Sequence, residues 1–326
     1  MTRWIVWGAG SIGARHLTNL LARGERDVVA LRREALPLEG ALARVPVQTD
    51  LQAARGQGEA AVIICTPTAL HLANAISAVR AGCDVLVEKP LSDTRDGLEA
   101  LRDLARRDGR IVGVAYCLRF HPTLRRVRDE LAAGALGRAL SVSVWCGQQL
   151  ADWHPGSDHT RSYSASQALG GGVILDLSHE LDYLQWCFGP VEAVTAAARN
   201  SGTLGIATED VADAILRLGD GLVATCHLDY LAQPAVRGGW AQCERGALRW
   251  DLLGGTVERS SGPGWERLAP PPTRPVDMYV AELDAFADAI ASRAPFAIDL
   301  DSGARTVAIA LAAKESSRQR REVAVA

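Results

Sequence analysis

Three side chains of this sequence have types suited to assisting a reaction in which a proton and a hydride leave an alcohol. His179 suits proton transfer because an imidazole titrates near neutral pH. Asp176 lies three residues earlier, so on one helix the two side chains would share a face. Lys89 follows an apolar run, where its ammonium could stabilise an oxygen that develops negative charge. These types suit oxidation of an alcohol. A buried structural histidine and a surface lysine are the alternatives that spacing alone favours.

A glycine-rich motif lies near the start of the chain, directly after an apolar run. Gly8, Gly10 and Gly13 have G-x-G-x-x-G spacing. Ser11 and Ile12 lie between the last two glycines. Such glycines allow a tight turn, backbone approach to a pyrophosphate, and close packing of a helix on a strand. The motif therefore predicts a dinucleotide site formed by these five residues, and a glycine-rich turn without a ligand is the alternative.

Two arginines follow the second expected strand, where the type of cofactor is selected. An NAD-binding protein usually has an acidic residue there for the ribose 2′-hydroxyl. This sequence has Arg32 and Arg33 instead, and the first carboxylate is Glu34. Guanidinium groups suit a 2′-phosphate through charge and paired hydrogen bonds, so the sequence favours NADP, with NAD as the alternative. The alternative is that these two arginines belong to a basic loop that is exposed to solvent and binds no cofactor.

The first third of the chain alternates between strand and helix patterns. Short apolar runs, typical of strands buried on both faces, occupy residues 4–7, 28–31, 46–47, 61–65, 85–87 and 111–114. Amphipathic stretches lie between them, and Asp93 or Thr94 could cap a helix that ends near Gly109. This alternation predicts βαβ units in a doubly wound parallel sheet, an α/β Rossmann domain over residues 1–118.

The pattern changes after about residue 119. Longer strand patterns cover residues 140–145, 191–197, 211–218 and 222–228, and Gly219–Gly221 joins the last two as a hairpin. One helix is expected from Gly172 to Cys187, a rigid loop at Pro270–Pro272, and further helices near the C-terminus that could pack back on the first domain. Successive strands predict an α+β domain over residues 119–326 with a large, open, mostly antiparallel sheet.

Composition excludes several classes of function. Of 326 residues, 48% are hydrophobic and 22% charged, and a net charge of −3 provides no attraction to nucleic acid or an anionic membrane. Seven scattered cysteines without a C-x-x-C pair fit reduced thiols and indicate neither a zinc cluster nor a disulfide framework. No apolar run approaches the roughly 20 residues of a membrane span. We expect a cytoplasmic protein without a metal site.

Short motifs occur in order along almost the whole chain. They are the glycine motif, Thr66-Pro67 with His71, Glu88-Lys89-Pro90, Arg119-Phe120-His121-Pro122, Gly170-Gly171-Gly172 with Asp176 and His179, and Ala313-Lys314-Glu315-Ser316. In this order they resemble the glucose-fructose oxidoreductase / inositol dehydrogenase / MocA family. The resemblance implies a Rossmann domain, a second domain whose open sheet often mediates oligomerisation, and a pyranose or cyclitol substrate. It therefore implies a small sugar-like substrate and a homodimer or homotetramer.

The resemblance also implies roles for individual residues. Lys89 matches the family lysine near the nicotinamide and the reacting hydroxyl, and the Lys89–Pro90 bond is expected to be cis. His179 matches the proton-transfer residue. Asp176 departs from the commoner pattern, in which aspartate precedes histidine by four residues, and it could orient the imidazole or contact the substrate or Lys89. By the same resemblance, cofactor contacts include Thr66, Pro67, His71, Glu88 and Lys89, and substrate contacts include Lys89, Arg119, Asp176 and His179.

A polar and aromatic loop precedes the catalytic helix that the resemblance implies. It contains Asp152-Trp153-His154-Pro155 and then Arg161 and Tyr163. A tryptophan face can stack on a sugar ring, and an arginine can hold a carboxylate, so Trp153, Arg161 and Tyr163 are predicted to contact the substrate. A loop packed by its own aromatic rings is the alternative. The loop and the Asp-Leu-Ser-His-Glu segment resemble a subgroup found with acidic nine-carbon sugar biosynthesis.

Three functional hypotheses follow. The leading one is an NADP- or NAD-dependent dehydrogenase that transfers a hydride between the nicotinamide and a hydroxyl or keto carbon of a sugar, sugar acid or cyclitol. The second is cofactor-assisted elimination or glycoside cleavage, in which the nucleotide is reduced and reoxidised in each cycle. The third is a nucleotide-sensing regulator without catalysis, against which the presence of both Lys89 and His179 argues.

Overall fold

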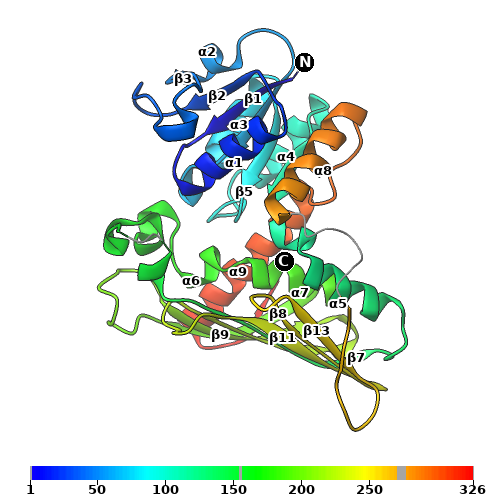
Figure 1. Ribbon diagram of the computed structural model, residues 1–326. Coiled ribbons are helices and arrows are strands. Elements are labelled where there is room, and N and C mark those ends of the chain that lie inside the picture. The colour runs from blue at the N-terminus through cyan, green and yellow to red at the C-terminus, as the bar shows by residue number, and fades with distance from the viewer. Residues whose placement is uncertain (1, 154–155, 270–276, 326) are drawn as a thin grey trace. The chain divides into compact units, whose positions relative to one another are not determined.

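Two compact units make up the fold, and the chain contributes two separate segments to each. The computed structural model describes residues 2–153, 156–269 and 277–325 (Figure 1). The first unit comprises Met1–Cys117 and Tyr279–Ala304, and the second comprises Leu118–Met278 and Arg305–Ala326. Two expected loop segments, His154-Pro155 and Pro270–Pro272, lie outside the described residues.

A parallel sheet forms the centre of the first unit. Its strands are β1 (Arg3–Trp7), β2 (Val28–Leu31), β3 (Val47–Gln48), β4 (Ala60–Ile64), β5 (Asp84–Glu88) and β6 (Val112–Ala115). Their order is β3-β2-β1-β4-β5-β6, and each neighbouring pair is parallel. β4 and β5 are completely buried, which explains their unbroken apolar runs, and the parallel pairing confirms the predicted Rossmann sheet. The strand order changes direction at β1 and β4, where ligands bind in open sheets of this kind.

Five helices accompany this sheet among the described residues: α1 (Ser11–Ala22), α2 (Leu51–Arg55), α3 (His71–Arg80), α4 (Leu98–Arg107) and α8 (Met278–Ser292). The predicted caps of α4 are wrong. The helix begins at Leu98 after Gly97, whose φ is 96°. The hydroxyl of Thr94 instead accepts a hydrogen bond from the backbone N–H of Asp96, so it stabilises the preceding turn.

An open sheet forms the centre of the second unit. Its strands are β7 (Ala139–Gly147), β8 (Val191–Arg199), β9 (Val211–Leu218), β10 (Val223–Asp229), β11 (Val236–Cys243), β12 (Gly246–Asp251), β13 (Thr256–Ser260), β14 (Glu266–Arg267) and β15 (Val323–Ala324). Their order is β14-β13-β12-β11-β7-β10-β9-β8-β15. Among these described strands, β7 and β10 pair in parallel and the other neighbours are antiparallel. The predicted open, mostly antiparallel sheet is confirmed.

Helices cover one face of this sheet. They are α5 (Pro122–Ala132), α6 (Val173–Asp176), α7 (His179–Phe188) and the greater part of α9 (Leu300–Gln319). The single helix expected from Gly172 to Cys187 is therefore wrong, because the chain breaks it at Leu177, where φ is −93° and ψ is 27°. Hydrogen bonds across the break span three residues, as in the N–H of Ser178 to the carbonyl of Leu175. No described helix is both long and apolar enough to span a membrane.

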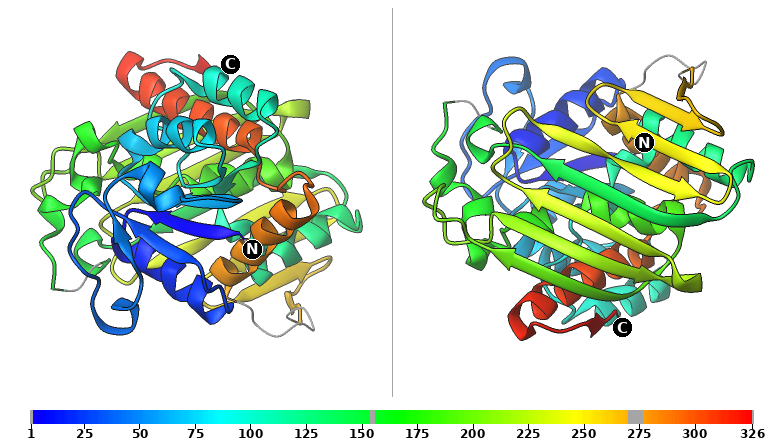
Figure 2. Two further views of the ribbon diagram at one scale, coloured as in Figure 1. Left: turned by 90° about the horizontal axis from the view of Figure 1, so that it is seen from above. Right: turned by 90° about the horizontal axis from the view of Figure 1, so that it is seen from below.

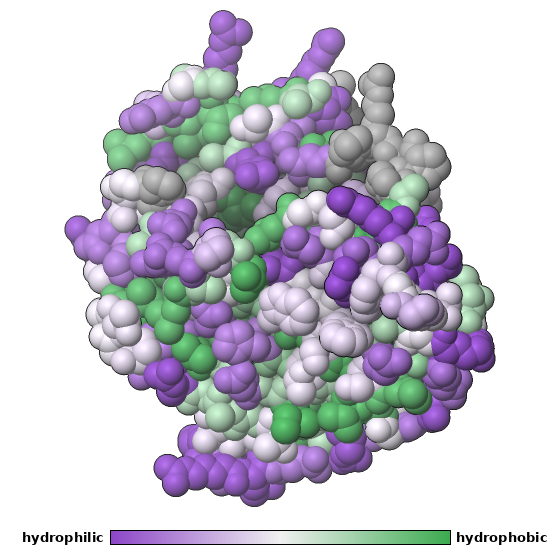
Figure 3. Space-filling view, turned by 60° about the horizontal axis from the view of Figure 1, so that its bottom comes forward, coloured by the Kyte–Doolittle hydropathy of each residue, from purple (hydrophilic) through white to green (hydrophobic). Residues whose placement is uncertain are grey.

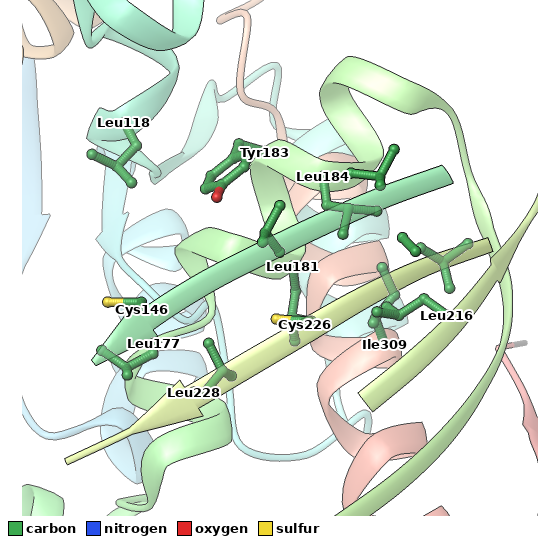
Figure 4. Packing of buried hydrophobic residues seen from close by; sticks show 14 of the residues in the cluster. Leu118, Cys146, Leu177, Leu181, Tyr183, Leu184, Leu216, Cys226, Leu228 and Ile309 are labelled. Carbon is green, nitrogen blue, oxygen red and sulfur yellow. The ribbon is translucent and has the colours of Figure 1, made fainter. Parts of the chain in front are cut away.

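The hydrophobic core of the second unit lies between the helices and the sheet. Cys146 of β7 and Cys226 and Leu228 of β10 alternate with outward-facing neighbours and point toward the helices, where Leu181 of α7 and Ile309 of α9 meet them (Figure 4). No helix of the described residues lies over the opposite face of the sheet (Figure 2, right). This period-two alternation is the pattern from which the strands were predicted.

We expect Gly113→Ala to destabilise the first unit. Gly113 lies on β6, and a Cβ there would overlap with the ring of buried Phe296, leaving Cε1 only 2.9 Å away. Overpacking of this kind costs about 1–3 kcal/mol. The matched control is Gly262→Ala, because a Cβ at that position would meet no atom within 4 Å. Urea unfolding that shows the same free energy for both variants would contradict this account.

Candidate active site

The turn between β1 and α1 packs closely around its glycines. Gly8 has a φ of 101°, and a Cβ there would lie 2.6 Å from the carbonyl oxygen of Cys65, just beyond β4. A Cβ at Gly13 would overlap with the carbonyl oxygen of Gly8. Glycine therefore fits both positions and larger residues do not, which is the reason for two of the predicted glycines. These contacts bring the N-terminus of α1 to the carboxyl edge of the first sheet.

The N-terminus of α1 has the features of a phosphate-binding helix end. Its N-cap is Gly10, with no side-chain cap and no acidic residue in the first turn. A Cβ at Gly10 would meet nothing within 4 Å, so open space lies beside this backbone. The first N–H groups of a helix lack partners within the helix and carry the positive end of its dipole. The turn from Gly8 through Ser11, Ile12 and Gly13 therefore fits the pyrophosphate of a dinucleotide.

The two arginines expected to select the cofactor follow β2 directly. Arg32 is half-buried, and its Nη1 donates a hydrogen bond to the carbonyl oxygen of Leu36 at 3.0 Å. Arg33 and Glu34 are exposed. The bond to Leu36 orients the Arg32 guanidinium beside the end of β2, where this fold places the ribose of the adenosine.

Lys89 follows β5 at the same carboxyl edge. The carboxylate of Glu88 is buried, and its Oε2 accepts a hydrogen bond from the backbone N–H of Lys89 at 3.2 Å. Its Oε1 accepts another at 2.8 Å from Nε2 of His16 on α1. The Lys89–Pro90 peptide bond is cis, as expected. His16 is not among the predicted site residues, although a polar side chain on the buried face of α1, one turn after Gly13, is a signal for it.

His71 is buried at the start of α3, and both of its ring nitrogens face backbone carbonyls. Nδ1 lies 2.8 Å from the carbonyl oxygen of Pro90, and Nε2 lies 2.7 Å from that of Thr66. Burial lowers the pKa of His71, although both carbonyls act in the opposite direction. The imidazole therefore ties the segment after β4, which includes Thr66 and Pro67, to the segment after β5. It orders this edge through the backbone, and the cofactor contact expected of His71 stays a prediction.

Asp176 and His179 are both buried, on either side of the break between α6 and α7. The prediction that they share one helix face is therefore wrong, because they belong to consecutive helices. Asp176 Oδ2 accepts a hydrogen bond of 2.6 Å from the hydroxyl of Tyr230, which follows β10. Burial and the charge of Asp176 raise the pKa of Tyr230 well above its usual value, so the phenol stays protonated and donates. The ring of Tyr230 meets Trp153 edge-on, with centroids 5.4 Å apart.

The glycine run before α6 packs against an ion pair. Gly172 has a φ of 114°, and a Cβ there would lie 2.6 Å from the carboxyl carbon of Glu209. Glu209 Oε1 lies 3.3 Å from Nζ of Lys314 on α9. The charge of Glu209 also raises the pKa of Tyr230. Glu209 and Tyr230 are thus polar residues of this region that the sequence analysis missed, because their partners are distant along the chain.

The loop before the glycine run consists of short helical turns. Trp153 and Tyr163 are half-buried, whereas Arg161 is exposed. Asp158 caps one turn by accepting a hydrogen bond from the N–H of Thr160 at 3.0 Å. An exposed guanidinium and two partly accessible aromatic rings therefore lie within one short loop of the second unit.

Arg119 has a structural partner that the sequence analysis did not anticipate. Its Nε and Nη2 donate to the two carboxylate oxygens of Asp182 on α7, at 2.8 and 2.7 Å. Both side chains are nearly inaccessible, and burial raises the pKa of Asp182 against the opposing effect of the Arg119 guanidinium. Arg237 and buried Glu180 form a second two-bond pair of this kind. The pair of Arg119 and Asp182 thus links α7 to the segment that begins the second unit, and the substrate contact expected of Arg119 stays a prediction.

Comparison with known protein families identifies both units. Residues 2–116 match the model for the oxidoreductase family with an NAD-binding Rossmann fold. Residues 124–249 match the model for the GFO/IDH/MocA C-terminal domain. The two matches follow each other in the order that the family has, and together they span most of the chain.

Individual relatives agree with this assignment. The chain is 28% identical to 1,5-anhydro-D-fructose reductase of Ensifer adhaerens, over 89% of this chain and 88% of that one. It is 30% identical to inositol 2-dehydrogenase 4 of Saccharopolyspora erythraea, over 59% of this chain and 54% of the relative, so this match spans about half of that protein.

Solved structures show the same fold. Levoglucosan dehydrogenase in complex with NADH and levoglucosan superposes with a TM-score of 0.87, at 20% identity over the full length of both chains. UDP-N-acetylglucosamine 3-dehydrogenase of Acidithiobacillus ferrooxidans superposes with a TM-score of 0.79, at 22% identity over 97% of this chain and 98% of that one. At these identities the likeness establishes the fold alone. With the two family matches, it follows that this chain belongs to the GFO/IDH/MocA family of oxidoreductases.

Proposed function

We propose that this protein is an NAD(P)-dependent dehydrogenase that transfers a hydride between the nicotinamide and a hydroxyl or keto carbon of a sugar, sugar acid or cyclitol. The observation that carries this proposal is the carboxyl edge of the first sheet. There the glycine turn at Gly8–Gly13 fits a dinucleotide, and Lys89 follows a buried carboxylate that holds its backbone. Relatives that act on anhydrofructose and inositol support a substrate of this class.

The cofactor would be held by the glycine turn, by Thr66 and Pro67 after β4, and by Arg32 and Arg33 after β2. A bound nicotinamide would supply the hydride acceptor for oxidation, or the hydride donor for the reverse reaction. The half-buried position of Arg32 beside β2 and the adjacent Arg33 support NADP over NAD, because a 2′-phosphate needs a cationic partner.

Lys89 and His179 would have different roles at the reacting oxygen. The Lys89 ammonium donates a hydrogen bond to the hydroxyl oxygen and stabilises the negative charge that develops there. His179 accepts the hydroxyl proton as the hydride leaves carbon, and it returns the proton when a ketone is reduced. Asp176 is held by the hydroxyl of Tyr230, so its carboxylate keeps one orientation and can contact the substrate or orient the imidazole.

The loop at Trp153–Tyr163 would contribute substrate contacts. An aromatic face at Trp153 or Tyr163 suits stacking on a sugar ring, and the exposed guanidinium of Arg161 suits a carboxylate. These residue types support an acidic sugar as the substrate. The buried pair with Asp182 makes Arg119 a positioning residue for α7, which carries His179.

Self-association would use the sheet face opposite the helices α5, α6, α7 and α9, which no described helix covers. Ile215 and Val223 are about half exposed on it (53% and 44%), and Trp240 is similar (47%). Hydrophobic groups are interspersed with hydrophilic ones on the surface seen in Figure 3. A second copy of the chain can bury these apolar groups at a two-fold interface, which supports a homodimer or homotetramer. All seven cysteines are free thiols, which supports a reducing, cytoplasmic location.

Removal of Arg32 and Arg33 should weaken binding of NADPH selectively. In Arg32→Ala/Arg33→Ala, we expect the dissociation constant for NADPH to rise by about tenfold or more, because charge-assisted bonds to the 2′-phosphate are lost. NADH binding should change by less than about twofold. Fluorescence titration measures both, and Arg106→Ala/Arg107→Ala, at exposed arginines of α4, is the matched control. Wild-type protein that binds NADH as tightly as NADPH would rule out the role of the arginines.

Loss of Lys89 or His179 should affect turnover more than cofactor binding. For Lys89→Met and His179→Gln we expect kcat to fall by about 10²- to 10⁴-fold, the usual contribution of a positioned acid, base or electrophile. A panel of sugars and sugar acids with NADP and NAD, followed by absorbance at the nicotinamide band, provides the measurement. His179→Gln should bind NADPH as wild type does. Product formed without net absorbance change would indicate elimination instead, and cofactor binding without any turnover would indicate a regulator.

A charge on the uncovered sheet face should separate the subunits. We expect Ile215→Glu to lower the molar mass in solution to that of a single chain, because a carboxylate cannot be buried unpaired at an interface. Light scattering after gel filtration measures the mass. Leu36→Glu, at an equally exposed leucine of the first unit, should leave the mass unchanged. A wild-type mass equal to one chain would disprove self-association.

A further inference from the structure

His16 is a histidine enclosed within the first unit. It lies on α1, on the same buried face as Gly13, Leu17 and Leu20, and its side chain is completely inaccessible. Burial of an imidazole among apolar residues is costly unless its polar atoms find partners. Its location, one turn after the cofactor loop, connects that loop with the interior of the unit.

The partner of His16 is the carboxylate of Glu88, and both oxygens of that carboxylate are engaged. Oε1 accepts the hydrogen bond from His16 Nε2 at 2.8 Å, and Oε2 accepts the bond from the N–H of Lys89 at 3.2 Å. The side chain of Glu88 is 10% exposed. A carboxylate held at both oxygens has one orientation, so the peptide that begins Lys89 has one orientation as well.

The tautomer of His16 follows from its surroundings. Nδ1 is buried and has no hydrogen-bond partner among the described residues. A proton on Nδ1 would leave a buried donor unpaired, whereas the tautomer protonated at Nε2 leaves only a lone pair unsatisfied. His16 therefore donates from Nε2 to Glu88.

The charge of Glu88 acts on several elements at this edge of the sheet. It raises the pKa of the Cys65 thiol after β4, in addition to the larger effect of burial. It also raises the pKa of Tyr279 on α8, again after burial and with the Cys117 thiol. The anion thus lies at the centre of the carboxyl edge, among groups from β4, α3, α8 and α1. The Glu88 carboxylate needs a hydrogen-bond donor inside the first unit, and His16 supplies one.

The other side of the lysine is also held. His71 reaches the carbonyl oxygen of Pro90 at 2.8 Å, just beyond Lys89. The backbone of the Glu88–Pro90 segment is therefore held before Lys89 by His16, acting through Glu88, and after Lys89 by His71. These two histidines lie on α1 and α3, the helices that follow β1 and β4.

We propose that His16 is a positioning residue for Lys89. It fixes Glu88, which fixes the backbone of Lys89, so the helix that opens the cofactor turn also sets where the reacting ammonium lies. This inference rests on the proposed function, because it assigns Lys89 to the reaction. A displacement of the reacting group by about 1 Å can lower the rate by up to about 100-fold.

Two variants of His16 with similar volume distinguish positioning from packing. His16→Gln retains a terminal N–H donor that can reach Glu88, whereas His16→Met fills the space without one. We expect kcat to fall about 10- to 100-fold in His16→Met and to return to within about threefold of wild type in His16→Gln. The NADPH dissociation constant should remain near that of wild type in both. If His16→Met does not fold, His16→Asn, whose amide is shorter, replaces it.

A second measurement does not require turnover. Lys89 and Lys314 are the two lysines of the sequence, so an amine-acetylating reagent followed by mass spectrometry reports on Lys89 with Lys314 as an internal reference. We expect the ratio of the Lys89 rate to the Lys314 rate to rise in His16→Met and to be restored in His16→Gln. The labelling is carried out on the whole NADPH-loaded protein.

The outcomes separate the two proposals. If wild type turns over a sugar and all His16 variants have the same kcat as wild type, the positioning role is overturned and the proposed function stands. Equal losses in His16→Gln and His16→Met would also overturn it, because they would show that shape alone matters. If no sugar is turned over by wild type, the proposed function fails. The labelling ratio then decides the inference, and an unchanged ratio overturns it.

Discussion

The close approach of α1 to the end of β1 is the constraint on which the first unit depends. Because no Cβ fits at Gly8 or Gly13, the helix begins almost against the strand end and its N-terminus reaches the carboxyl edge of the sheet. The same approach brings His16, one turn later, within 2.8 Å of Glu88 on β5. A glycine spacing that suits a phosphate thus also determines a hydrogen bond two strands away from β1 in the sheet.

The second unit positions its polar groups by pairing rather than by close backbone contact. Arg119 with Asp182 and Arg237 with Glu180 are two-bond pairs with buried carboxylates, and they attach α7 to its surroundings. Breaking such a pair leaves a buried charge without compensation, so each one restricts the helix to one arrangement. The hydrogen bond from Tyr230 restricts Asp176 in the same manner. These residues define the geometry beside His179 without themselves having to react.

Features that depend on residues close together in the sequence were predicted. Features that depend on contacts between distant residues were missed. The parallel strands and the tight glycine turn were predictable because apolar runs and G-x-G-x-x-G spacing act within a few residues. Tyr230 was missed because its partner Asp176 lies 54 residues away along the chain. The break at Leu177 was not predicted because no proline or glycine lies there. The bond of Arg119 to Asp182 was not predicted either, because no sequence pattern reveals a partner that lies 63 residues further on.

The place of β7 in its sheet has a consequence for how the chain folds as it is synthesised. β7 pairs in parallel with β10 on one side and antiparallel with β11 on the other, and both of these strands leave the ribosome much later. The first unit also lacks Tyr279–Ala304 until most of the chain has emerged. A nascent chain therefore exposes apolar strand edges for much of its synthesis, and long-range pairing of this kind forms slowly. Folding inside the cell would thus depend on protection of these edges before β11 arrives.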